Sequence, residues 1–334
     1  PAIPDRRSFL ARASAIGAVS AAGALLSACR LEEQPASGGQ QAPGTTPPVG
    51  LKAAAPYAAR DASLPARAPG GHATVKFTAE EVNVYATQDL VVPAWTFNGT
   101  MPGPFIHVGV GDTVDFTLTN HGKIPHSMDF HAAQINPKEA FKSAMSGESH
   151  SFSFKPRRAG AFMYHCGTQP VLMHIGMGMV GAIIVDPPTP LPPAKEFVLV
   201  ESELYLGKDD KGAPMFDYNK MLGTLPDYVV FNGIADQYLH NPITVKKGDR
   251  VRFYVVNAGP TQTCAFHIVG EQFDVVYLGE PPANAIRGVQ TFAVPAGGGM
   301  IFELDCDVAG EFPFVNHQFG HGQKGAMGLL VVES

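Results

Sequence analysis

Charged residues are scarce in this sequence: lysine, arginine, aspartate and glutamate together make up 16% of its 334 residues. The formal net charge is −6, and no stripe or cluster of basic residues occurs beyond the first few positions. A surface that binds nucleic acid needs such a cluster to neutralise phosphates. We therefore expect no nucleic acid among the partners of this protein.

Long helical patterns are also missing. After residue 28, no stretch keeps a helical period of apolar side chains for three turns. Instead, 36 glycines and 29 prolines divide the chain into short segments, most of which alternate apolar and polar residues. Alternation bounded by turn residues is typical of strands, so the sequence predicts an all-β fold of antiparallel sandwiches. The clearest predicted strands are 74–79, 110–119, 149–154 and 181–185.

Residues 1–28 have the composition of an export signal. Their apolar run, at about 15–26, follows a basic start and is too short to span a membrane. Arg6 and Arg7, followed by Ser-Phe-Leu, resemble a twin-arginine signal for proteins that are exported already folded. We therefore expect a periplasmic or other extracytoplasmic protein.

A possible lipid attachment point follows the apolar run. Leu-Ser-Ala-Cys at 26–29 resembles a lipobox, which would leave Cys29 as a lipid-bearing N-terminus. Cleavage near Ala28 without a lipid is the alternative. Residues 29–70 are mostly Gly, Pro, Ala, Gln and Ser, a composition that predicts a disordered linker. In the lipoprotein interpretation, the protein is anchored to the membrane only through this lipid.

The sequence after residue 70 repeats itself. The repeated pairs of segments are 97–99 with 231–233, 111–116 with 248–253, 130–131 with 266–267, 159–160 with 309–310, and 179–185 with 326–332. Such a repeat predicts two homologous Greek-key β-sandwiches in tandem. We expect the first at 71–187 and the second at 188–334, with the proline-rich stretch 187–195 as the hinge between them.

Soft and borderline metal ligands gather near the end of the first repeat. Cys166 is followed by His174 after eight residues and by Met179 after five more, and His126 can supply a second imidazole. Two histidines, a cysteine and a weak thioether are the ligand set of a blue-copper, or type 1, electron-transfer site. Met177 competes with Met179 for the thioether position. The alternative is that these side chains only pack in a core.

Two further histidines indicate a second metal site. His131 and His165 each lie an odd number of residues from a predicted type 1 ligand. On extended chain, residues at odd separations point to opposite faces. The second site would therefore be joined to the first by the single peptide unit between His165 and Cys166.

The second repeat lacks most of the type 1 ligands. We place Ala326 in register with Met179, Gln262 with His126, and His321 with His174, and no cysteine occurs at the place of Cys166. We therefore expect no type 1 copper in the second sandwich.

Several motifs resemble those of the two-domain copper-containing nitrite reductases, which consist of cupredoxin domains. They are Phe-Asn-Gly-Thr-Met-Pro-Gly-Pro at 97–104, Pro-His-Ser-Met-Asp-Phe-His-Ala-Ala at 125–133, Tyr-His-Cys at 164–166, the His-to-Met spacing at 174–179, Phe-His-Ile-Val-Gly-Glu at 266–271, and Val-Asn-His at 315–317. The resemblance extends from about residue 72 to the end. It implies one-electron reduction of nitrite to nitric oxide and water at a type 2 copper that is supplied by a type 1 copper.

The resemblance also implies a role for each matching residue. Type 1 copper would be held by His126, Cys166, His174 and Met179; type 2 copper by His131, His165 and His317; and protons would come from the catalytic residues Asp129 and His267. In that family His317 would come from the neighbouring subunit of a homotrimer, with one copper of each type per subunit. The electron donor would be a small cupredoxin or a cytochrome c.

The sequence departs from the family pattern at two places. The loop 167–173 is one residue shorter than in the best-known branch and lacks its tryptophan, which leaves the colour of the type 1 site open. Val269 stands where many members have an isoleucine over the type 2 copper.

Three other functions are alternatives to this one. A two-domain multicopper oxidase needs His-x-His and His-Cys-His motifs, which 129–131 and 165–167 do not provide. An electron-transfer cupredoxin leaves Asp129, His131 and the later histidines without a role. A copper-storage or structural lipoprotein predicts no turnover.

Two cysteines of the second repeat remain. Cys264 and Cys306 lie on predicted strands, and an exported protein can oxidise such a pair. A disulfide and two buried thiols are both compatible with the sequence, because it does not show the Cα separation.

Overall fold

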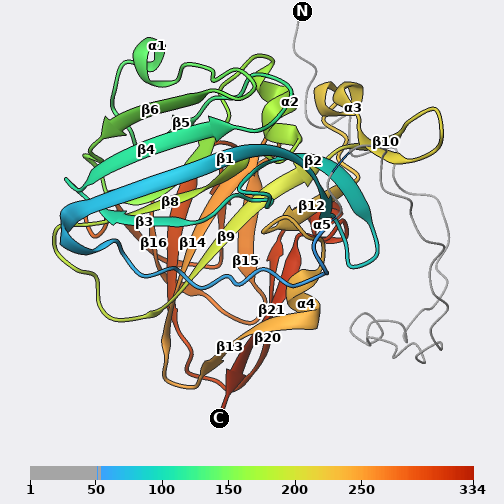
Figure 1. The fold of residues 1–334 in the computed structure, drawn as a ribbon. Helices are drawn as coiled ribbons and strands as arrows, with labels where there is room; N and C mark the ends of the chain where they lie inside the picture. The colour runs from blue at the N-terminus through green and yellow to red at the C-terminus, as the bar shows by residue number, and fades with distance from the viewer. Residues whose placement is uncertain (1–50, 52–53) are drawn as a thin grey trace, which may run out of the picture. The chain divides into compact units, whose positions relative to one another are not determined.

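The computed structural model describes residue 51 and residues 54–334, coloured by position in Figure 1. The predicted export signal at 1–28, with Cys29, lies outside the described residues, as does most of the predicted linker before residue 54. Within the described residues the chain consists mostly of strands joined by tight turns, as the sequence predicts.

The first sandwich consists of two four-stranded sheets, with strand orders β2-β1-β4-β6 and β3-β8-β7-β5. Its strands are β1 (His72–Tyr85), β2 (Val91–Phe97), β3 (Ile106–Gly109), β4 (Thr113–Asn120), β5 (Asp129–Phe130), β6 (Ser149–Phe154), β7 (Gly160–His165) and β8 (Val180–Asp186). β1 is parallel to β4 and β3 is parallel to β8, while the other neighbours are antiparallel. The four strands predicted most clearly fall on β1, β4, β6 and β8.

The second sandwich has a six-stranded sheet, β12-β9-β14-β19-β16-β17, and a five-stranded sheet, β13-β21-β20-β15-β18. Its strands are β9 (Lys195–Leu204), β12 (Tyr228–Phe231), β13 (Asn241–Lys246), β14 (Arg250–Gly259), β15 (Cys264–Ile268), β16 (Phe273–Tyr277), β17 (Ala285–Val289), β18 (Thr291–Val294), β19 (Gly299–Asp305), β20 (Gly310–Asn316) and β21 (Met327–Glu333). A separate hairpin consists of β10 (Leu206–Lys208) and β11 (Pro214–Phe216).

The strand pairings repeat between the two sandwiches. β9 runs parallel to β14 as β1 does to β4, and β13 runs parallel to β21 as β3 does to β8. The repeated Phe-Asn-Gly motif adopts the same turn twice, because Asn98 and Asn232 both have left-handed backbone angles, with φ of 56° and 54°. Asparagine is one of the few residues that tolerate this conformation. The predicted tandem of two cupredoxin-type sandwiches is therefore confirmed.

Each sandwich has its own aromatic core, and a third apolar cluster joins the two. The alternating strand β4 buries every second side chain, including Phe116 and Leu118, in the first core. β8 is buried along almost its whole length, because Ile183 faces that core while Ala182 and Ile184 face β9, β14 and β19 of the second sandwich. The two sandwiches therefore pack together through the β7–β8 sheet.

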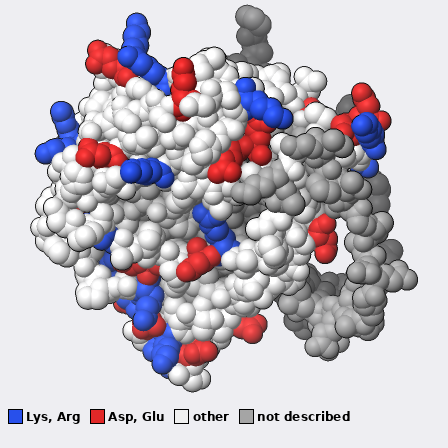
Figure 2. Space-filling view, in the orientation of Figure 1, with Lys and Arg blue, Asp and Glu red and all other residues white. Residues whose placement is uncertain are grey.

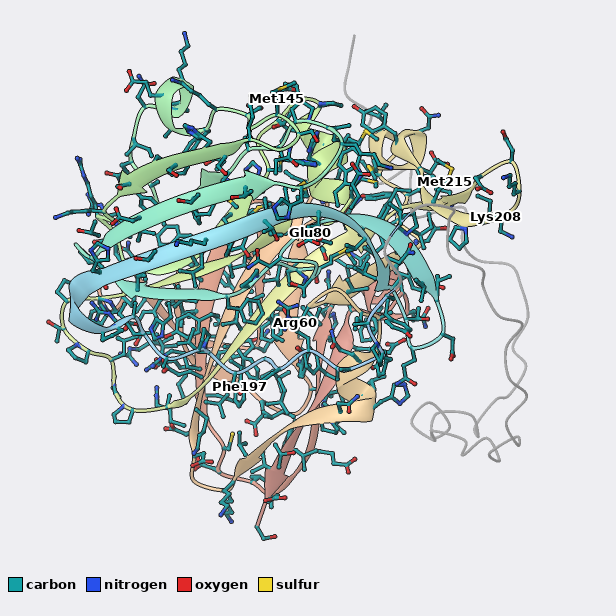
Figure 3. The ribbon with its side chains drawn as sticks, viewed as in Figure 1. Arg60, Glu80, Met145, Phe197, Lys208 and Met215 are labelled. Carbon is teal, nitrogen blue, oxygen red and sulfur yellow. The ribbon has the colours of Figure 1, made fainter. Side chains whose placement is uncertain are left out.

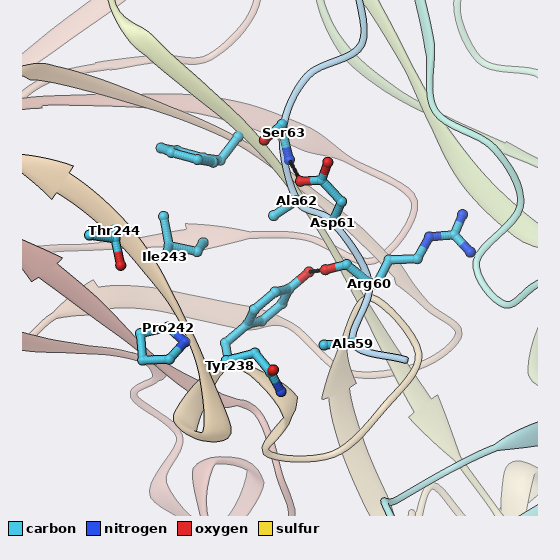
Figure 4. Close-up of a pocket in the computed structure, with 11 residues that line it drawn as sticks. Ala59, Arg60, Asp61, Ala62, Ser63, Tyr238, Pro242, Ile243 and Thr244 are labelled. Carbon is cyan, nitrogen blue, oxygen red and sulfur yellow. Dashed lines mark hydrogen bonds between the residues drawn. The ribbon is translucent and has the colours of Figure 1, made fainter. Parts of the chain in front are cut away.

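The N-terminal end of the described chain is a strap along both sandwiches. Val198 N donates to Ala62 O at 2.7 Å, and Leu64 N donates to Glu196 O at 3.0 Å. Tyr238 Oη donates to Arg60 O at 3.0 Å beside a cavity of about 350 Å³ (Figure 4). The prediction of a disordered linker that extends to residue 70 is therefore wrong for residues 60–68, because their backbone groups and Ala62 have partners on the sandwiches.

Short helices complete the described structure. They are α1 (Pro137–Ala140), α2 (Val171–Gly176), α3 (Tyr218–Leu222), α4 (Gln237–His240) and α5 (Phe319–Gly322), with a 3₁₀ turn at Pro69–Gly71. α2 packs against α3, where the Met221 side chain fills the space beside Gly176. A search of the described residues finds no helix with the length and apolar character needed to cross a membrane. Figure 2 shows charged side chains of both signs scattered over one face, separated by wide uncharged areas.

Candidate metal centres

His126, Cys166 and His174 converge in the interior of the first sandwich, and we call them the buried cluster. His126 pairs with Ala144 just before β5, Cys166 follows β7, and His174 lies on α2. The Cys166 Sγ atom is 3.2 Å from His174 Nδ1 and 3.9 Å from His126 Nδ1, and the two Nδ1 atoms are 3.3 Å apart. All three side chains are almost completely excluded from solvent.

The protonation state of the buried cluster suits a soft metal ion. Burial lowers the pKa of His174 to about 4, and burial together with the charge of His174 lowers that of His126 to about 4. Both rings are therefore neutral near pH 7, with nitrogen lone pairs free to bind metal. Burial raises the pKa of the Cys166 thiol, and hydrogen bonds from Ser127 and Thr168 partly oppose this effect. Two neutral imidazoles and a thiol that can ionise on metal binding fit copper.

The structure separates the two methionines that compete for the thioether position. Met179 is fully buried in the same core cluster as Cys166, and Met177 packs in another cluster with Met221. Backbone hydrogen bonds hold Met179 at the site, since Cys166 N donates to Met179 O at 3.0 Å and Met179 N donates to His174 O at 3.1 Å. Met179 is therefore the better placed thioether.

Three residues around the buried cluster escaped the sequence prediction. Ser127 N donates to Cys166 Sγ at 3.3 Å, and Thr168 Oγ1 donates to Ser127 Oγ at 3.1 Å. Trp95, on β2, places its ring centroid 4.7 Å from that of His174 and 5.7 Å from that of His126. The loop 167–173 has no tryptophan, but a distant strand supplies one. The only sequence signal is that Trp95 is the single tryptophan of the chain.

Asp129, His131 and His165 form a second group, which we call the surface cluster. The Nε2 atoms of His131 and His165 are 3.2 Å apart, and Asp129 Oδ2 is 3.8 Å from His165 Nε2. His165 is buried, Asp129 is about one-third exposed, and His131 is exposed. The cluster therefore opens at the molecular surface.

Backbone carbonyls orient the two imidazoles of the surface cluster. His165 Nδ1 lies 2.9 Å from Cys166 O, and His131 Nδ1 lies 2.9 Å from Gly297 O on the second sandwich. A carbonyl only accepts, so each Nδ1 carries a proton, and in the neutral tautomer of each ring the lone pair is on Nε2. Burial lowers the pKa of His165, opposed by its Cys166 carbonyl bond and by Asp129. Convergent Nε2 atoms on rings whose Nδ1 atoms donate to carbonyls are the arrangement of a metal site.

His267 and His317 lie together on the second sandwich, and we call them the histidine pair. Their ring centroids are 5.1 Å apart, and His317 N donates to Ala265 O at 2.7 Å. His267 Nδ1 lies 2.6 Å from Gln290 O, so its Nε2 is available. Among the described residues, neither histidine belongs to the buried or the surface cluster of its own chain. His317 is exposed, and the exposed Phe319 ring packs against it at 4.7 Å.

The sheet register corrects two correspondences of the repeat. Asp129 pairs with His165, whereas His267 pairs with Val315, one position before Asn316. Counting from the matched starts of β7 and β20, Val315 corresponds to His165, so His267 corresponds to Asp129 and not to His131. By the same count Cys264, not Gln262, occupies the place of His126. Cys264 pairs with Val294 in the second sandwich, as His126 pairs with Ala144 in the first. The loop after Asn257 is one residue longer than the loop after Asn120, which shifts the sequence alignment.

The remaining cysteines are not linked. Cys264 and Cys306 are both free and fully buried in the core of the second sandwich. Burial raises the pKa of both thiols. Of the two alternatives that the sequence left open, the structure therefore has two buried thiols.

Comparisons with known proteins agree with this architecture. Two family models described as multicopper oxidase match residues 78–190 and 212–334. The copper-containing nitrite reductase of Neisseria meningitidis serogroup A is 40% identical over 247 residues, which cover 72% of this chain and 64% of that protein. The copper-containing nitrite reductase of Pseudomonas chlororaphis is 30% identical over 279 residues, which cover 76% of each chain. The chain thus spans just under two thirds of the length of its Neisseria relative.

A solved structure gives the same result. The copper nitrite reductase from Nitrosomonas europaea superposes with a TM-score of 0.73 at 36% identity, covering 79% of this chain and 94% of that one. The paired sandwiches and the two adjacent donor clusters define a two-domain cupredoxin that binds copper. Within that class, the chain belongs to the family of copper-containing nitrite reductases.

Proposed function

We propose that the protein reduces nitrite to nitric oxide and water. The observation that carries this proposal is the junction at His165-Cys166, where two adjacent residues belong to two different donor clusters. Copper held in both clusters would supply the redox chemistry, taking up an electron at the buried cluster and binding nitrite at the surface cluster. The peptide unit between His165 and Cys166 is then the shortest covalent connection between them.

The two clusters take different ligand roles in this proposal. The buried cluster, with Met179 beside it, is the type 1 site, because a thiolate with two imidazoles and a weak thioether suits electron transfer. The surface cluster contributes His131 and His165 to the type 2 site. Of the imidazoles in the described residues, two converge there, so a catalytic site with three imidazoles takes its third from elsewhere.

We assign that third ligand to His317 of a neighbouring subunit. His317 is exposed and His267 is partly exposed, and neither belongs to a metal-binding group among the described residues of its own chain, while the surface cluster opens at the molecular surface with two imidazoles. A cyclic arrangement in which each subunit offers its histidine pair to the next completes every site. The family resemblance makes this arrangement a homotrimer, with one type 1 and one type 2 copper per subunit.

Asp129 and His267 are the proposed catalytic residues. The reaction adds one electron and two protons to nitrite and yields nitric oxide and water. The Asp129 carboxylate lies beside His165 Nε2, within reach of an anion bound at the surface cluster. His267 arrives with His317 from the neighbouring subunit, and its free Nε2 can carry the second proton.

The electron donor is a small cupredoxin or a cytochrome c that docks over the buried cluster. Met145 is 52% exposed and follows Ala144, the backbone partner of His126 (Figure 3). An exposed methionine this close to an electron-transfer site suits a weak, adaptable protein contact. The twin-arginine signal and the lipobox at Cys29 would place the enzyme outside the cytoplasm, anchored through a lipid.

The test is a single-turnover experiment on the copper-loaded full chain. The type 1 centre is reduced without oxygen, nitrite is added, and both the visible band and nitric oxide are followed. We expect the band to return with one nitric oxide per type 1 centre. In His131→Ala we expect no return with nitrite, although a chemical oxidant still restores the band. A band that ignores nitrite in fully loaded protein would leave an electron carrier and overturn the proposal.

A further inference from the structure

The second sandwich keeps the frame of the buried cluster but fills it with different side chains. Cys166 N donates to Met179 O, and in the same way Asn316 N donates to Ala326 O. Ser127 N donates to the Cys166 sulfur, and Ala265 N donates to Asn316 Oδ1. Asn316 therefore occupies the place of the metal-binding cysteine. It also directly precedes His317, the proposed third ligand of the surface cluster.

Every polar atom of the Asn316 side chain has a partner. Its Oδ1 accepts from Ala265 N at 3.1 Å and from Gln318 N at 3.0 Å. Its Nδ2 donates to the Glu201 carboxyl at 3.2 Å and lies 3.2 Å from His321 Nδ1. The amide oxygen thus binds the backbone of Gln318, which follows His317, and that of Ala265 on β15, while the amide nitrogen is held by Glu201 and His321. We call Glu201, Asn316 and His321 the Asn316 network.

Glu201 is an unusual acid for this location. It is 1% exposed on β9, and the corresponding position on β1 is Ala79, since Glu201 pairs with Asn257 as Ala79 pairs with Asn120. Burial, with the charge of Glu203 adding to it, raises the pKa of Glu201 to about 8. A buried carboxyl without a role is costly, and an alanine fits this position in the first sandwich. The acid is therefore specific to the sandwich that presents His317.

We propose that Glu201 is a positioning residue for the type 2 centre. By holding the Asn316 amide, it fixes the backbone that carries His317 and so sets the direction in which that ring leaves the subunit. The proposal rests on the proposed function, because it takes His317 as a ligand. Glu201 itself touches neither substrate nor metal. Its neutral form is sufficient, since its contact with Asn316 is to accept a hydrogen bond.

The test compares Glu201→Leu with Glu201→Gln in the full chain. The glutamine keeps a neutral hydrogen-bond acceptor for Asn316 Nδ2, and the leucine removes it. Copper affinity is measured at each centre from the visible band of the type 1 site and the electron paramagnetic resonance signal of the type 2 site. We expect Glu201→Leu to weaken the type 2 site by about tenfold or more, the size typical of lost outer-sphere partners. We expect Glu201→Gln to bind copper at the type 2 site as tightly as the parent. The type 1 band should be unchanged in both variants.

The matched control is Glu203→Leu. Glu203 is a second fully buried acid on β9, but its partners are Thr261, Gln262 and Tyr205, not Asn316. It should cost stability without a selective loss of type 2 copper. If Glu201→Leu does not fold, His321→Leu, which removes the other partner of Asn316 Nδ2, should show a smaller loss of the same kind.

Two results would overturn the inference. One is a folded, normally assembled Glu201→Leu or His321→Leu variant that binds type 2 copper as tightly as the parent. The other is an equal loss in Glu203→Leu, which would reduce the effect to general destabilisation. Failure of the proposed function looks different, because the parent protein itself would then show no second copper signal or would not turn over nitrite.

Discussion

The two sandwiches place different chemistry in the same frame. In the first, the Nδ1 atoms of His126 and His174 and the Sγ atom of Cys166 lie close together, and no amide or carboxyl group lies between them. In the second, Cys264, Asn316 and His321 occupy the corresponding places, and the Asn316 amide satisfies its neighbours. The first arrangement is complete only when a cation binds, whereas the second is complete without one. The second sandwich therefore has a polar network, and not an apolar core, at the place of the buried cluster.

The histidines outside this frame show the same division of labour. The first sandwich offers His131 and His165 with lone pairs converging, and the second offers the histidine pair at its surface. In the proposed assembly, one sandwich would hold the surface cluster and the other would carry the histidine that completes it in a neighbouring subunit.

The largest expected effect comes from removing the cysteine in one frame and not in the other. In Cys166→Ala we expect the visible band to disappear and nitric oxide release to fall to background, since the thiolate ligand and the electron entry point are both lost. The control is Cys264→Ala, a fully buried cysteine at the place of His126 in the second frame. The absorption spectra and the nitrite turnover of the two variants are compared, and Cys264→Ala should keep both the visible band and turnover. Loss of the band in Cys264→Ala would contradict the assignment of the two frames.

The copper affinity of the surface cluster should survive in Cys166→Ala. His131 and His165 keep their carbonyl acceptors in that variant, because Cys166 contributes its backbone oxygen and not its sulfur. One copper per chain with the resonance signal of a type 2 site is expected. A chain that binds none would show that the two clusters do not fold independently.

The pH dependence of stability should have opposite signs in the two frames of the metal-free protein. His126 and His174 have folded pKa values of about 4, below 6.5, so the unfolded chain binds more protons in this window. The free energy of unfolding then rises with pH between 4 and 6.5, by up to about 3 kcal/mol for each ring. Glu201 has a folded pKa of about 8, above 4.5, so its contribution falls as pH rises between 4.5 and 8, by up to about 5 kcal/mol.

Denaturant unfolding of variants separates these opposite slopes. Between pH 6.5 and 8 only Glu201 titrates among the three groups, so the parent should lose stability there and Glu201→Gln should not. Between pH 4.5 and 6.5 the rise due to the histidines should become visible once Glu201→Gln removes the opposing slope. Identical pH profiles for the parent and Glu201→Gln would show that the pKa of Glu201 is not raised in the folded protein.

Much of this comparison could be predicted from local sequence patterns. The spacing of Cys166, His174 and Met179 lies within one loop and one short helix, so it is visible in the sequence. The period-two strands and the repeated Phe-Asn-Gly turn are local for the same reason. The parts that could not be predicted involve partners far away in sequence: Gly297 O at His131 and Glu201 at Asn316, 166 and 115 residues apart.

The errors have the same cause. A sequence alignment of the repeats sets Gln262 opposite His126 because it matches Phe266-His267 to Phe130-His131, whereas the strand register moves the match by two positions, to Cys264. The predicted linker ends too late, at residue 70, because Gly, Pro and Ala composition does not show that the backbone near Ala62 pairs with β9. In both cases the deciding contact is a backbone hydrogen bond between distant segments.

The smallest expected effect concerns Trp95, which lies beside the first frame only. It is the single tryptophan of the chain, with its ring 4.7 Å from that of His174. Copper bound at the buried cluster should therefore quench tryptophan fluorescence, and copper at the surface cluster should quench it much less. Titration of His131→Ala should show the quenching of the parent, while titration of Cys166→Ala should show it only weakly.

Replacing this ring tests its contribution to the packing of the buried cluster. Trp95→Phe keeps an aromatic ring next to His174 but removes part of the contact with His126, so we expect the free energy of unfolding to fall by about 1 kcal/mol. The visible band should persist, because no ligand is changed, and the fluorescence response should vanish with the only fluorophore of its kind. A lost band would make Trp95 necessary to hold the ligand rings in place. An unchanged stability would mean that α2 and its contact with Met221 alone position His174.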